Sequence, residues 1–236
     1  MPEMYNTTCI TQTAATVAAL MRFPAPAAAA EPIPVVLEAA QNRFGALPVE
    51  RMLLYNPDAI AMWLFQKYTP AFSGVMLHSC LTIPVRSVMP SVTPVCFASM
   101  YTGVMPEVHG IRAYEKPVLK CETLFDAAIA AGRRVAIVST EGDSMSKIFL
   151  ERKMDYYILP TPQACNEKAA ELMERDAYDL LALYNRNYDA AMHRNGPESE
   201  RSLEELKRNA DTFACFEQMA RRVWRGKRAA MAFLPD

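Results

Sequence analysis

The chain has 236 residues, of which 51% are hydrophobic and 22% charged, a balance typical of folded globular proteins rather than disordered ones. A chain of this length suits one sizeable domain with a large buried core. The formal net charge of −1 excludes a strongly basic surface, and no apolar run approaches the ~20 residues of a membrane-spanning helix. We therefore expect neither nucleic acid nor a membrane as a partner.

The cysteines and the N-terminal residues bear on the cellular compartment. No C-x-x-C pair occurs among the six widely scattered cysteines, which predicts reduced, mostly buried thiols and a cytoplasmic setting. The apolar stretch Thr13 to Met21 loosely resembles the core of a signal peptide, but the first twelve residues contain no Lys or Arg. A secreted or periplasmic location is therefore the less favoured alternative.

Apolar patterning predicts the order of the elements. Residues 1–34 are rich in Ala and Pro, and we expect an arm that wraps the surface with irregular structure and a short helix. Residues 35–236 are expected to form one α/β domain. It starts with a helix over 35–44 and a buried strand over 52–55 that ends in Asn-Pro-Asp. The later elements expected are helices over 59–68, 94–101, 123–131, 165–175 and 199–225, and strands over 74–81, 134–139, 179–184 and 229–234.

The alternation of short apolar strands with helices predicts a largely parallel sheet. In such sheets the chemistry collects at the carboxyl ends of the strands. Asp58, Asp189 and Asp236 each follow a predicted strand closely, so these three carboxylates are candidate site residues.

Thr93 is a candidate nucleophile in the segment SVTPVCFASMYTGVMPEVHGI, residues 91–111. We expect it to be the N-cap of a helix with Pro94 in the first helical position, where backbone N–H groups and the helix dipole favour anions. A threonine hydroxyl needs a metal or a base beside it to act as a nucleophile. Taken alone, Thr-Pro at a helix start is more often simple capping. Cys96 is a weaker candidate nucleophile because no base is evident near it.

Asp189 and His193 form a second candidate pair, four residues apart in the segment DAAMHRNGP. From one helical face or one loop, a carboxylate and an imidazole can share a divalent metal. In isolation, a solvated Asp and a surface His is the commoner arrangement. Asp58 likewise has two possible roles, a metal ligand or a helix cap, because a single Asp after a strand is often only a cap.

Together these segments resemble the alkaline phosphatase superfamily, in the branch of type I phosphodiesterases and nucleotide pyrophosphatases. Thr93 matches the nucleophile position, and nine residues later the motif T-G-x-x-P-x-x-H-G-I is matched at Thr102, Gly103, Pro106, His109, Gly110 and Ile111. Residues 189–197 are similar to the family's D-x-x-G-H-x-x-G-P element, with Met192 in place of its first glycine. Asp58 matches the family's first metal-binding Asp, although Ala59 replaces the usual glycine.

The resemblance implies an alkaline phosphatase-like three-layer sandwich with a largely parallel central sheet, incomplete at the C-terminus. It implies hydrolysis of phosphate esters, of the phosphodiesterase or pyrophosphatase type, through Thr93 and two divalent metals, zinc or alternatively manganese. One metal would be held by Asp58, Asp236 and the Thr93 oxygen, and the other by Asp189 and His193. The expected partner is a small-molecule phosphate ester.

Three further expectations follow from the same resemblance. Asp236 matches the Asp of an Asp-His-Gly element whose remainder is absent from the 236 residues, so we expect this chain to be inactive or nearly so. His109 is expected to support the fold near the site, and His78 to be structural. A phosphotransferase or phosphomutase on the same core, or a non-catalytic binding domain that kept the fold, are the alternative functions.

Overall fold

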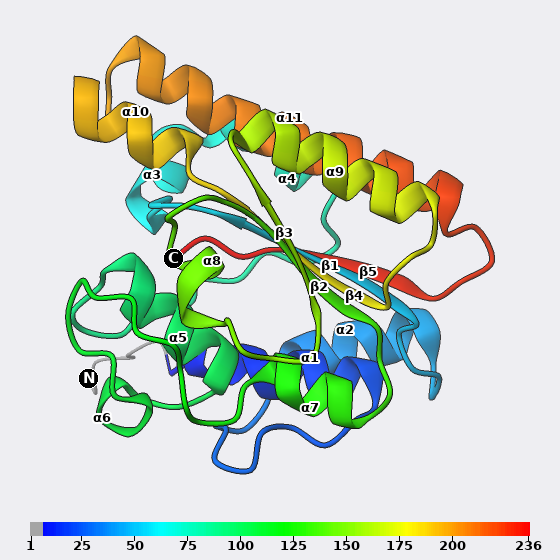
Figure 1. Ribbon diagram of the computed structural model, residues 1–236. Coiled ribbons are helices and arrows are strands. Elements are labelled where there is room, and N and C mark those ends of the chain that lie inside the picture. Colours follow the sequence, from blue (N-terminus) through cyan, green and yellow to red (C-terminus); the bar gives the residue numbers. More distant parts are fainter. Residues whose placement is uncertain (1–6) are drawn as a thin grey trace, which may run out of the picture.

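The protein is an α/β fold around a five-stranded sheet in which every strand pairing is parallel (Figure 1), seen in a computed structural model that describes residues 7–236. The strand order is β3-β2-β4-β1-β5. The strands are β1 (Arg51–Pro57), β2 (Val135–Thr140), β3 (Asp155–Leu159), β4 (Leu180–Asn185) and β5 (Ala229–Phe233). The predicted α/β fold with a largely parallel sheet is confirmed.

Helices cover both faces of the sheet, as Figure 1 shows. The helices are α1 (Thr13–Met21), α2 (Pro34–Phe44), α3 (Met62–Lys67), α4 (Ser73–Met76), α5 (Thr93–Thr102), α6 (Pro106–His109), α7 (Leu124–Ala130), α8 (Met145–Ile148), α9 (Pro162–Glu174), α10 (Asn187–Asn195) and α11 (Glu200–Val223), with 3₁₀ turns η1 (Ile10–Gln12) and η2 (Thr69–Phe72). Strand β1 explains the two layers, because its side chains alternate. Met52 and Leu54 join the core under α1, α5 and α7, whereas Leu53 and Tyr55 join the core under α9 and α11.

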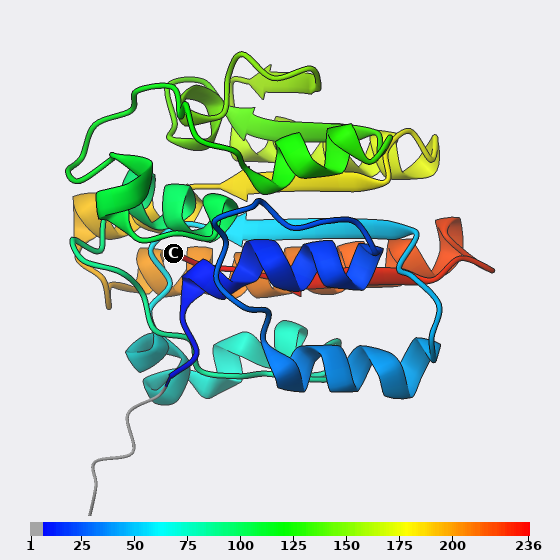
Figure 2. The same cartoon turned by 90° about the horizontal axis from the view of Figure 1, so that it is seen from below.

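The expected surface arm is wrong for α1. Seven of its nine residues are buried, and Ala14 and Ala18 are completely so. Their small side chains let α1 pack in the same core cluster as α5 and α7 (Figure 2). The Ala-rich composition that reads as an arm is therefore a close-packed core helix. The first six residues of the expected arm lie outside the described residues.

Two predicted elements near residues 59–81 differ from the structure. The helix expected over 59–68 begins only at Met62, because Ala59 has a positive φ of 61° that no helix accommodates. The strand expected over 74–81 is wrong, since α4 occupies its start and loop its remainder. A Cβ on Gly74 would lie 2.5 Å from the Ala210 carbonyl oxygen, so the missing side chain lets α4 pack directly on the backbone of α11.

Strand β3 is absent from the predicted elements, and its sequence explains why. The stretch DYYIL mixes a carboxylate and two tyrosines with two aliphatic residues, and no position in it is fully buried. It lies at one edge of the sheet and pairs only with β2. An edge strand with one neighbour does not need the continuous apolar run by which β1, β2 and β4 are found.

Two further features concern the cysteines and the lengths of the helices. All six cysteines are free, and Cys9, Cys96 and Cys165 are buried. Within residues 7–236, none of the helices is both long enough and apolar enough to pass through a bilayer.

Candidate active site

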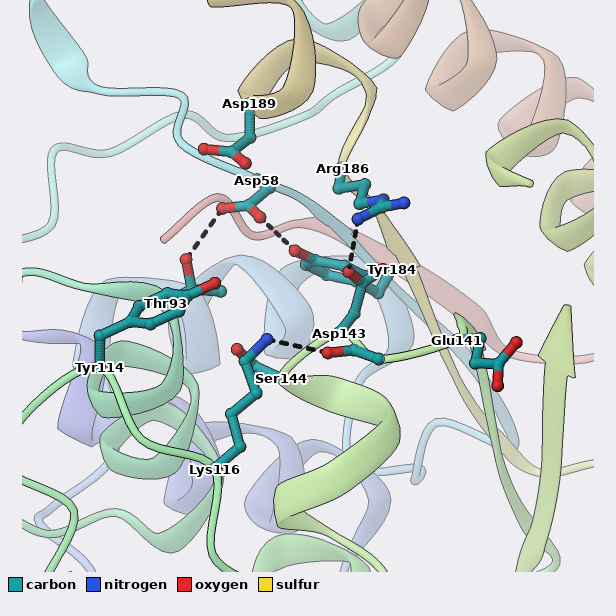
Figure 3. Close-up of a pocket in the computed structure, with 11 residues that line it drawn as sticks. Asp58, Thr93, Tyr114, Lys116, Glu141, Asp143, Ser144, Tyr184, Arg186 and Asp189 are labelled. Carbon is teal, nitrogen blue, oxygen red and sulfur yellow. Dashed lines mark hydrogen bonds and ion pairs between the residues drawn. The ribbon is translucent and has the colours of Figure 1, made fainter. Parts of the chain in front are cut away.

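A cavity of about 170 Å³ lies at the carboxyl ends of β1, β2 and β4 (Figure 3). It is lined by Asp58, Thr93, Tyr114, Lys116, Glu141, Gly142, Asp143, Ser144, Tyr184, Arg186 and Asp189. Three of the residues predicted from the sequence, Asp58, Thr93 and Asp189, therefore converge on one cavity. This is the edge at which parallel sheets place their chemistry.

Thr93 is held by the packing of α5. Every residue from Pro94 to Thr102 is buried, and the Tyr101 hydroxyl donates a 2.6 Å hydrogen bond to Asn56 Oδ1 on β1. Thr93 itself is the first helical residue rather than the N-cap, which is Val92, and Pro94 is the second. Its hydroxyl is not used for capping and donates to Asp58 Oδ1 at 3.2 Å. The capping interpretation of Thr93 is therefore wrong, and its oxygen faces the cavity.

Asp58 is fixed by the turn that follows β1. Its side chain is 3% exposed, and its backbone N–H donates to the Asn185 carbonyl oxygen at 2.9 Å. The helix that follows begins at Met62, so Asp58 caps no helix. The left-handed conformation of Ala59 turns the Ala59 N–H toward Asp236 Oδ1, 2.9 Å away. A glycine would adopt this φ more readily, so the alanine carries a modest conformational cost here.

Asp236 thus lies beside Asp58, although it does not line the cavity. The pKa of Asp58 is raised well above its usual value by burial and by the negative charges of Asp236 and Asp189. Burial likewise raises the pKa of Asp236. The Tyr184 hydroxyl donates to Asp58 Oδ2, and burial together with the Asp58 charge raises the pKa of that tyrosine. Several like charges crowded in a poorly solvated place favour the binding of a proton or a cation.

Asp189 and His193 lie on α10 and contact each other, with 3.1 Å between Asp189 Oδ1 and His193 Nε2. Asp189 faces the cavity, and burial raises its pKa. The His193 side chain is 71% exposed and is not part of the cavity lining. The structure therefore brings Asp189 to the site, whereas it places His193 on the solvent side of Asp189.

Four charged lining residues were not predicted from the sequence, namely Lys116, Glu141, Asp143 and Arg186. Asp143 is 5% exposed, in the turn after β2, and burial raises its pKa to about 6 against the opposing charges of Arg186 and Lys116. Arg186 Nη1 lies 3.3 Å from Asp143 Oδ1, and Lys116 Nζ donates to the Gly142 carbonyl oxygen at 2.8 Å. The position of Asp143 after a correctly predicted parallel strand was the available signal. Lys116 lies in a loop without any recognisable pattern.

The side chains around the cavity determine which metals the site could hold. Within residues 7–236, no group of three or more His, Cys, Asp or Glu side chains is arranged to hold a metal ion. However, Asp58 and Asp236 are neighbouring carboxylates with raised pKa values, and the Thr93 oxygen lies beside them. Carboxylate and hydroxyl oxygens of this kind fit a divalent cation, and Asp189 with His193 offers a carboxylate and an imidazole for another.

The remaining candidates have structural partners. His109 is buried between Ser99 Oγ, 2.9 Å from Nε2, and the Ile111 N–H, which donates to Nδ1, and burial lowers its pKa to about 4. His78 Nδ1 lies 3.0 Å from Glu217 Oε2 on α11. Cys96 is 1% exposed and burial raises the pKa of its thiol, which disfavours the nucleophilic thiolate.

Comparison with known proteins gives one family match and several structural ones. Residues 55–120 match the sequence model of the type I phosphodiesterase / nucleotide pyrophosphatase family. No curated protein matches the chain. The segment matched by the family contains the end of β1, Asp58, Thr93 and the motif ending at Ile111.

The fold matches solved structures at low identity. Human ectonucleotide pyrophosphatase / phosphodiesterase 5 superposes with a TM-score of 0.63 at 17% identity, covering 79% of this chain and 56% of its own. An inactive murine form of that enzyme in complex with AMP gives 0.61 at 16%, covering 77% and 55%. Phosphonoacetate hydrolase from Sinorhizobium meliloti, in complex with phosphonoacetate, gives 0.54 at 16%, covering 73% and 55%.

The chain thus spans a little over half the length of each of these structures. The family match covers the Thr93 segment. The structural matches cover most of the chain, including the parallel sheet at whose carboxyl edge that segment lies. The resemblance to the alkaline phosphatase superfamily, in its type I phosphodiesterase / nucleotide pyrophosphatase branch, is confirmed in sequence over residues 55–120 and in fold over most of the chain.

Proposed function

We propose that the protein hydrolyses phosphate esters, in the manner of phosphodiesterases and pyrophosphatases, with Thr93 as the nucleophile. The observation that carries the proposal is the Thr93 hydroxyl, which begins helix α5 and donates to the buried Asp58 at the wall of a polar cavity. The family match over residues 55–120 supports the reaction class. A threonine that only capped a helix would turn its oxygen to the helix N–H groups instead.

Thr93, Asp58 and helix α5 each have a role in the proposed reaction. The hydrogen bond to Asp58 holds the Thr93 oxygen with its lone pairs toward the cavity, and the buried helix α5 fixes its position. The oxygen attacks phosphorus as its proton passes to Asp58, and the leaving group departs as an alkoxide that takes a proton from solvent. Water then cleaves the phospho-threonine, and Asp58 returns the proton to the Thr93 oxygen. The positive end of α5 lies beside the attacked phosphoryl group and favours its negative charge.

Two divalent cations, zinc or manganese, are part of the proposal. Asp58, Asp236 and the Thr93 oxygen would hold one, and Asp189 with His193 the other. When bound, they would neutralise the crowded carboxylates and lower the pKa of the Thr93 hydroxyl. The raised pKa values of Asp58, Asp189 and Asp236 support this assignment, because each of these carboxylates lacks a cationic partner strong enough to offset its burial.

The test is to trap the covalent intermediate. The protein is mixed with p-nitrophenyl phosphate or bis(p-nitrophenyl) phosphate and excess zinc, quenched in acid, digested and examined by mass spectrometry. We expect a phosphoryl group, or a nitrophenyl phosphoryl group from the diester, on the peptide containing Thr93, and none in Thr93→Ala. Slow turnover by this chain does not prevent the label, because a single attack on phosphorus produces it. Thr93→Ser should retain it, because the serine hydroxyl can occupy the same position. Turnover by Thr93→Ala at the wild-type rate would refute the assignment.

The same samples address the alternative functions. Adding glycerol as an acceptor separates hydrolysis from transfer, since a phosphotransferase would release glycerol phosphate in place of inorganic phosphate. A non-catalytic binding domain would show neither the phosphopeptide nor zinc-dependent stabilisation against heat.

A further inference from the structure

We propose that Lys116 and Arg186 form a subsite for a second anionic group on the substrate. The substrate class is then small phosphate esters that carry a carboxylate close to the ester. This inference rests on the proposed function of the Thr93 site and adds a specificity that the reaction class does not contain.

Lys116 and Arg186 reach one cavity from separate segments of the chain. Lys116 comes from the loop after α6, and Arg186 precedes α10, yet both line the same cavity as Thr93. In Figure 3 the two side chains lie on either side of the turn after β2, Arg186 toward Asp58 and Lys116 on the side of Tyr114. A phosphoryl group at Thr93 would leave this turn and its two cations to the rest of the substrate.

Both cations are held in place and keep unused hydrogen-bond donors. Lys116 Nζ spends one of its three donors on the Gly142 carbonyl oxygen, and Arg186 has a single 3.3 Å contact to Asp143. Gly142 has a φ of 79°, a conformation that lets the turn present its carbonyl oxygen to the lysine. The remaining N–H groups of the two side chains can donate to an anion without breaking these contacts.

The cavity is small and mostly polar. Its volume of about 170 Å³ is below the roughly 300–1,000 Å³ of pockets that enclose drug-sized ligands. Among its lining residues none has an aliphatic side chain, and Lys116 Nζ lies 5.1 Å from the ring centroid of Tyr114, so one face of that ring is taken. Apart from the rings of Tyr114 and Tyr184 the cavity offers no apolar wall, so an acyl chain finds little to pack against, whereas a short charged group does find donors.

The charges that line the cavity favour a carboxylate over a second phosphate. Glu141, Asp143 and Asp189 line the cavity together with the two cations. A doubly charged phosphate beside these carboxylates meets more repulsion than a singly charged carboxylate does. The planar fork of a guanidinium also matches a carboxylate in geometry.

The test uses two probes that differ in one group. 3-Phosphonopropionate and propylphosphonate have the same chain length, and only the first ends in a carboxylate. Their dissociation constants are measured by calorimetry, with and without added zinc. We expect 3-phosphonopropionate to bind the wild-type protein about tenfold or more tightly, which is the effect of one good charge-assisted contact.

The variants assign that preference to the two residues. Lys116→Ala and Arg186→Gln should each reduce the ratio of the two dissociation constants several-fold, with propylphosphonate affinity unchanged within twofold. Lys120→Ala and Arg175→Gln are matched controls, because Lys120 pairs with Glu151 and Arg175 with Glu171, and neither lines the cavity. Thermal melting confirms that each variant is folded.

Three outcomes overturn the inference. They are equal binding of both probes by the wild-type protein, binding of neither probe, and an equal weakening of both probes by the variants. Each outcome is separable from the proposed function, since the phosphoryl group on the Thr93 peptide is assayed with aryl phosphates that carry no carboxylate. If that phosphopeptide forms while the probe ratio is one, only the second-anion subsite fails.

Discussion

The two ends of the sheet hold the same residue type in opposite electrostatic settings. At the amino end, Asp176 accepts hydrogen bonds from both Arg51 Nε, at 2.6 Å, and Arg51 Nη2, at 2.8 Å, and it also pairs with Lys227. The Arg51 hydrogen bonds lower the pKa of Asp176 well below its ordinary range. Asp179 is buried, but its hydrogen bonds from Arg134 outweigh burial and lower its pKa as well.

At the carboxyl end the carboxylates have weaker partners. Asp58, Asp189 and Asp236 all have raised pKa values, because burial exceeds the stabilising contacts they make, and at Asp58 the negative charges of Asp236 and Asp189 add to this effect. One end of the sheet therefore uses its aspartates to stabilise the fold, and the other keeps aspartates at a cost in stability. Such a cost is expected where a site is prepared for a ligand.

Asp58→Asn should give the largest effect. A carboxyl whose pKa is raised in the folded state keeps a proton that the unfolded chain releases, so it lowers stability above about pH 4. The amide removes this penalty, and we expect the metal-free protein to gain about 1 kcal/mol in denaturant unfolding at pH 7. Hydrolysis should fall by on the order of 100-fold or more, because the group that orients Thr93 is lost.

The effect of zinc on the melting temperature tests whether Asp58 holds a cation. Added zinc should raise the melting temperature of the wild-type protein, since a ligand that binds only the folded state stabilises it. It should raise that of Asp58→Asn much less. An unchanged zinc effect in the variant would show that Asp58 does not hold the cation.

Asp176→Asn tests the other end of the sheet and should have the opposite sign. The amide leaves Arg51 and Lys227 without their carboxylate, and we expect a loss of about 1–2 kcal/mol in denaturant unfolding at pH 7, allowing for the partial exposure of this network. The folded pKa of Asp176 is lowered, so its contribution is present above the unfolded pKa near 4 and is lost as the pH falls further.

Each of these variants is the control for the other. Asp176→Asn should keep its activity, and its stability deficit relative to wild type should shrink below pH 4. A loss of stability in both variants, or a gain in both, would contradict the contrast between the two ends of the sheet.

The parts of the site that follow from local pattern were predictable. Strands β1, β2, β4 and β5 read as apolar runs, and the residues after them are fixed by the parallel sheet. This places Asp58 and Asp236 at one edge, and the sequence motif locates Thr93 on its helix. Asp189 joins them because α10 begins two residues before it.

The remaining parts depend on tertiary packing. Nothing local tells that the Ala-rich α1 is a core helix, since alanines fit equally well on a surface, and the burial of Ala14 comes from α5 and α7. Gly74 is read correctly only when its contact with α11 is known. Lys116 and Arg186 meet at one cavity through loops far apart in the chain, and a side chain in a loop has no periodicity by which to predict its direction.

His109 provides a test of intermediate size behind the site. Its folded pKa of about 4 lies below the ordinary value, so the unfolded chain binds the proton first as the pH falls. The free energy of unfolding should therefore fall between about pH 6.5 and 4, with His109 contributing about 2 kcal/mol of this fall by pH 5.

His109→Asn isolates that contribution. The amide oxygen can accept from the Ile111 N–H in place of Nδ1, while the contact with Ser99 is lost. We expect the variant to be less stable at pH 7.5, and its deficit relative to wild type to narrow by pH 5, measured by urea unfolding at both values. A deficit that stays constant with pH would show that the ring is protonated in the folded protein.

The smallest effect on stability is expected for His193→Ala, at the outer rim of the site. The imidazole is 71% exposed and its contact with Asp189 is an i,i+4 pair on one helix, a kind that contributes at most about 0.5 kcal/mol. Unfolding of the metal-free variant should thus match wild type within that margin. A zinc ligand behaves differently, because its loss removes one of few donors, and we expect zinc affinity to fall at least tenfold.

His78→Ala is the matched control, since its ring pairs with Glu217 on α11 and does not line the cavity. It should leave zinc affinity unchanged. Unaltered zinc binding in His193→Ala would make this histidine a surface residue, and Asp189 would then hold its cation with other donors.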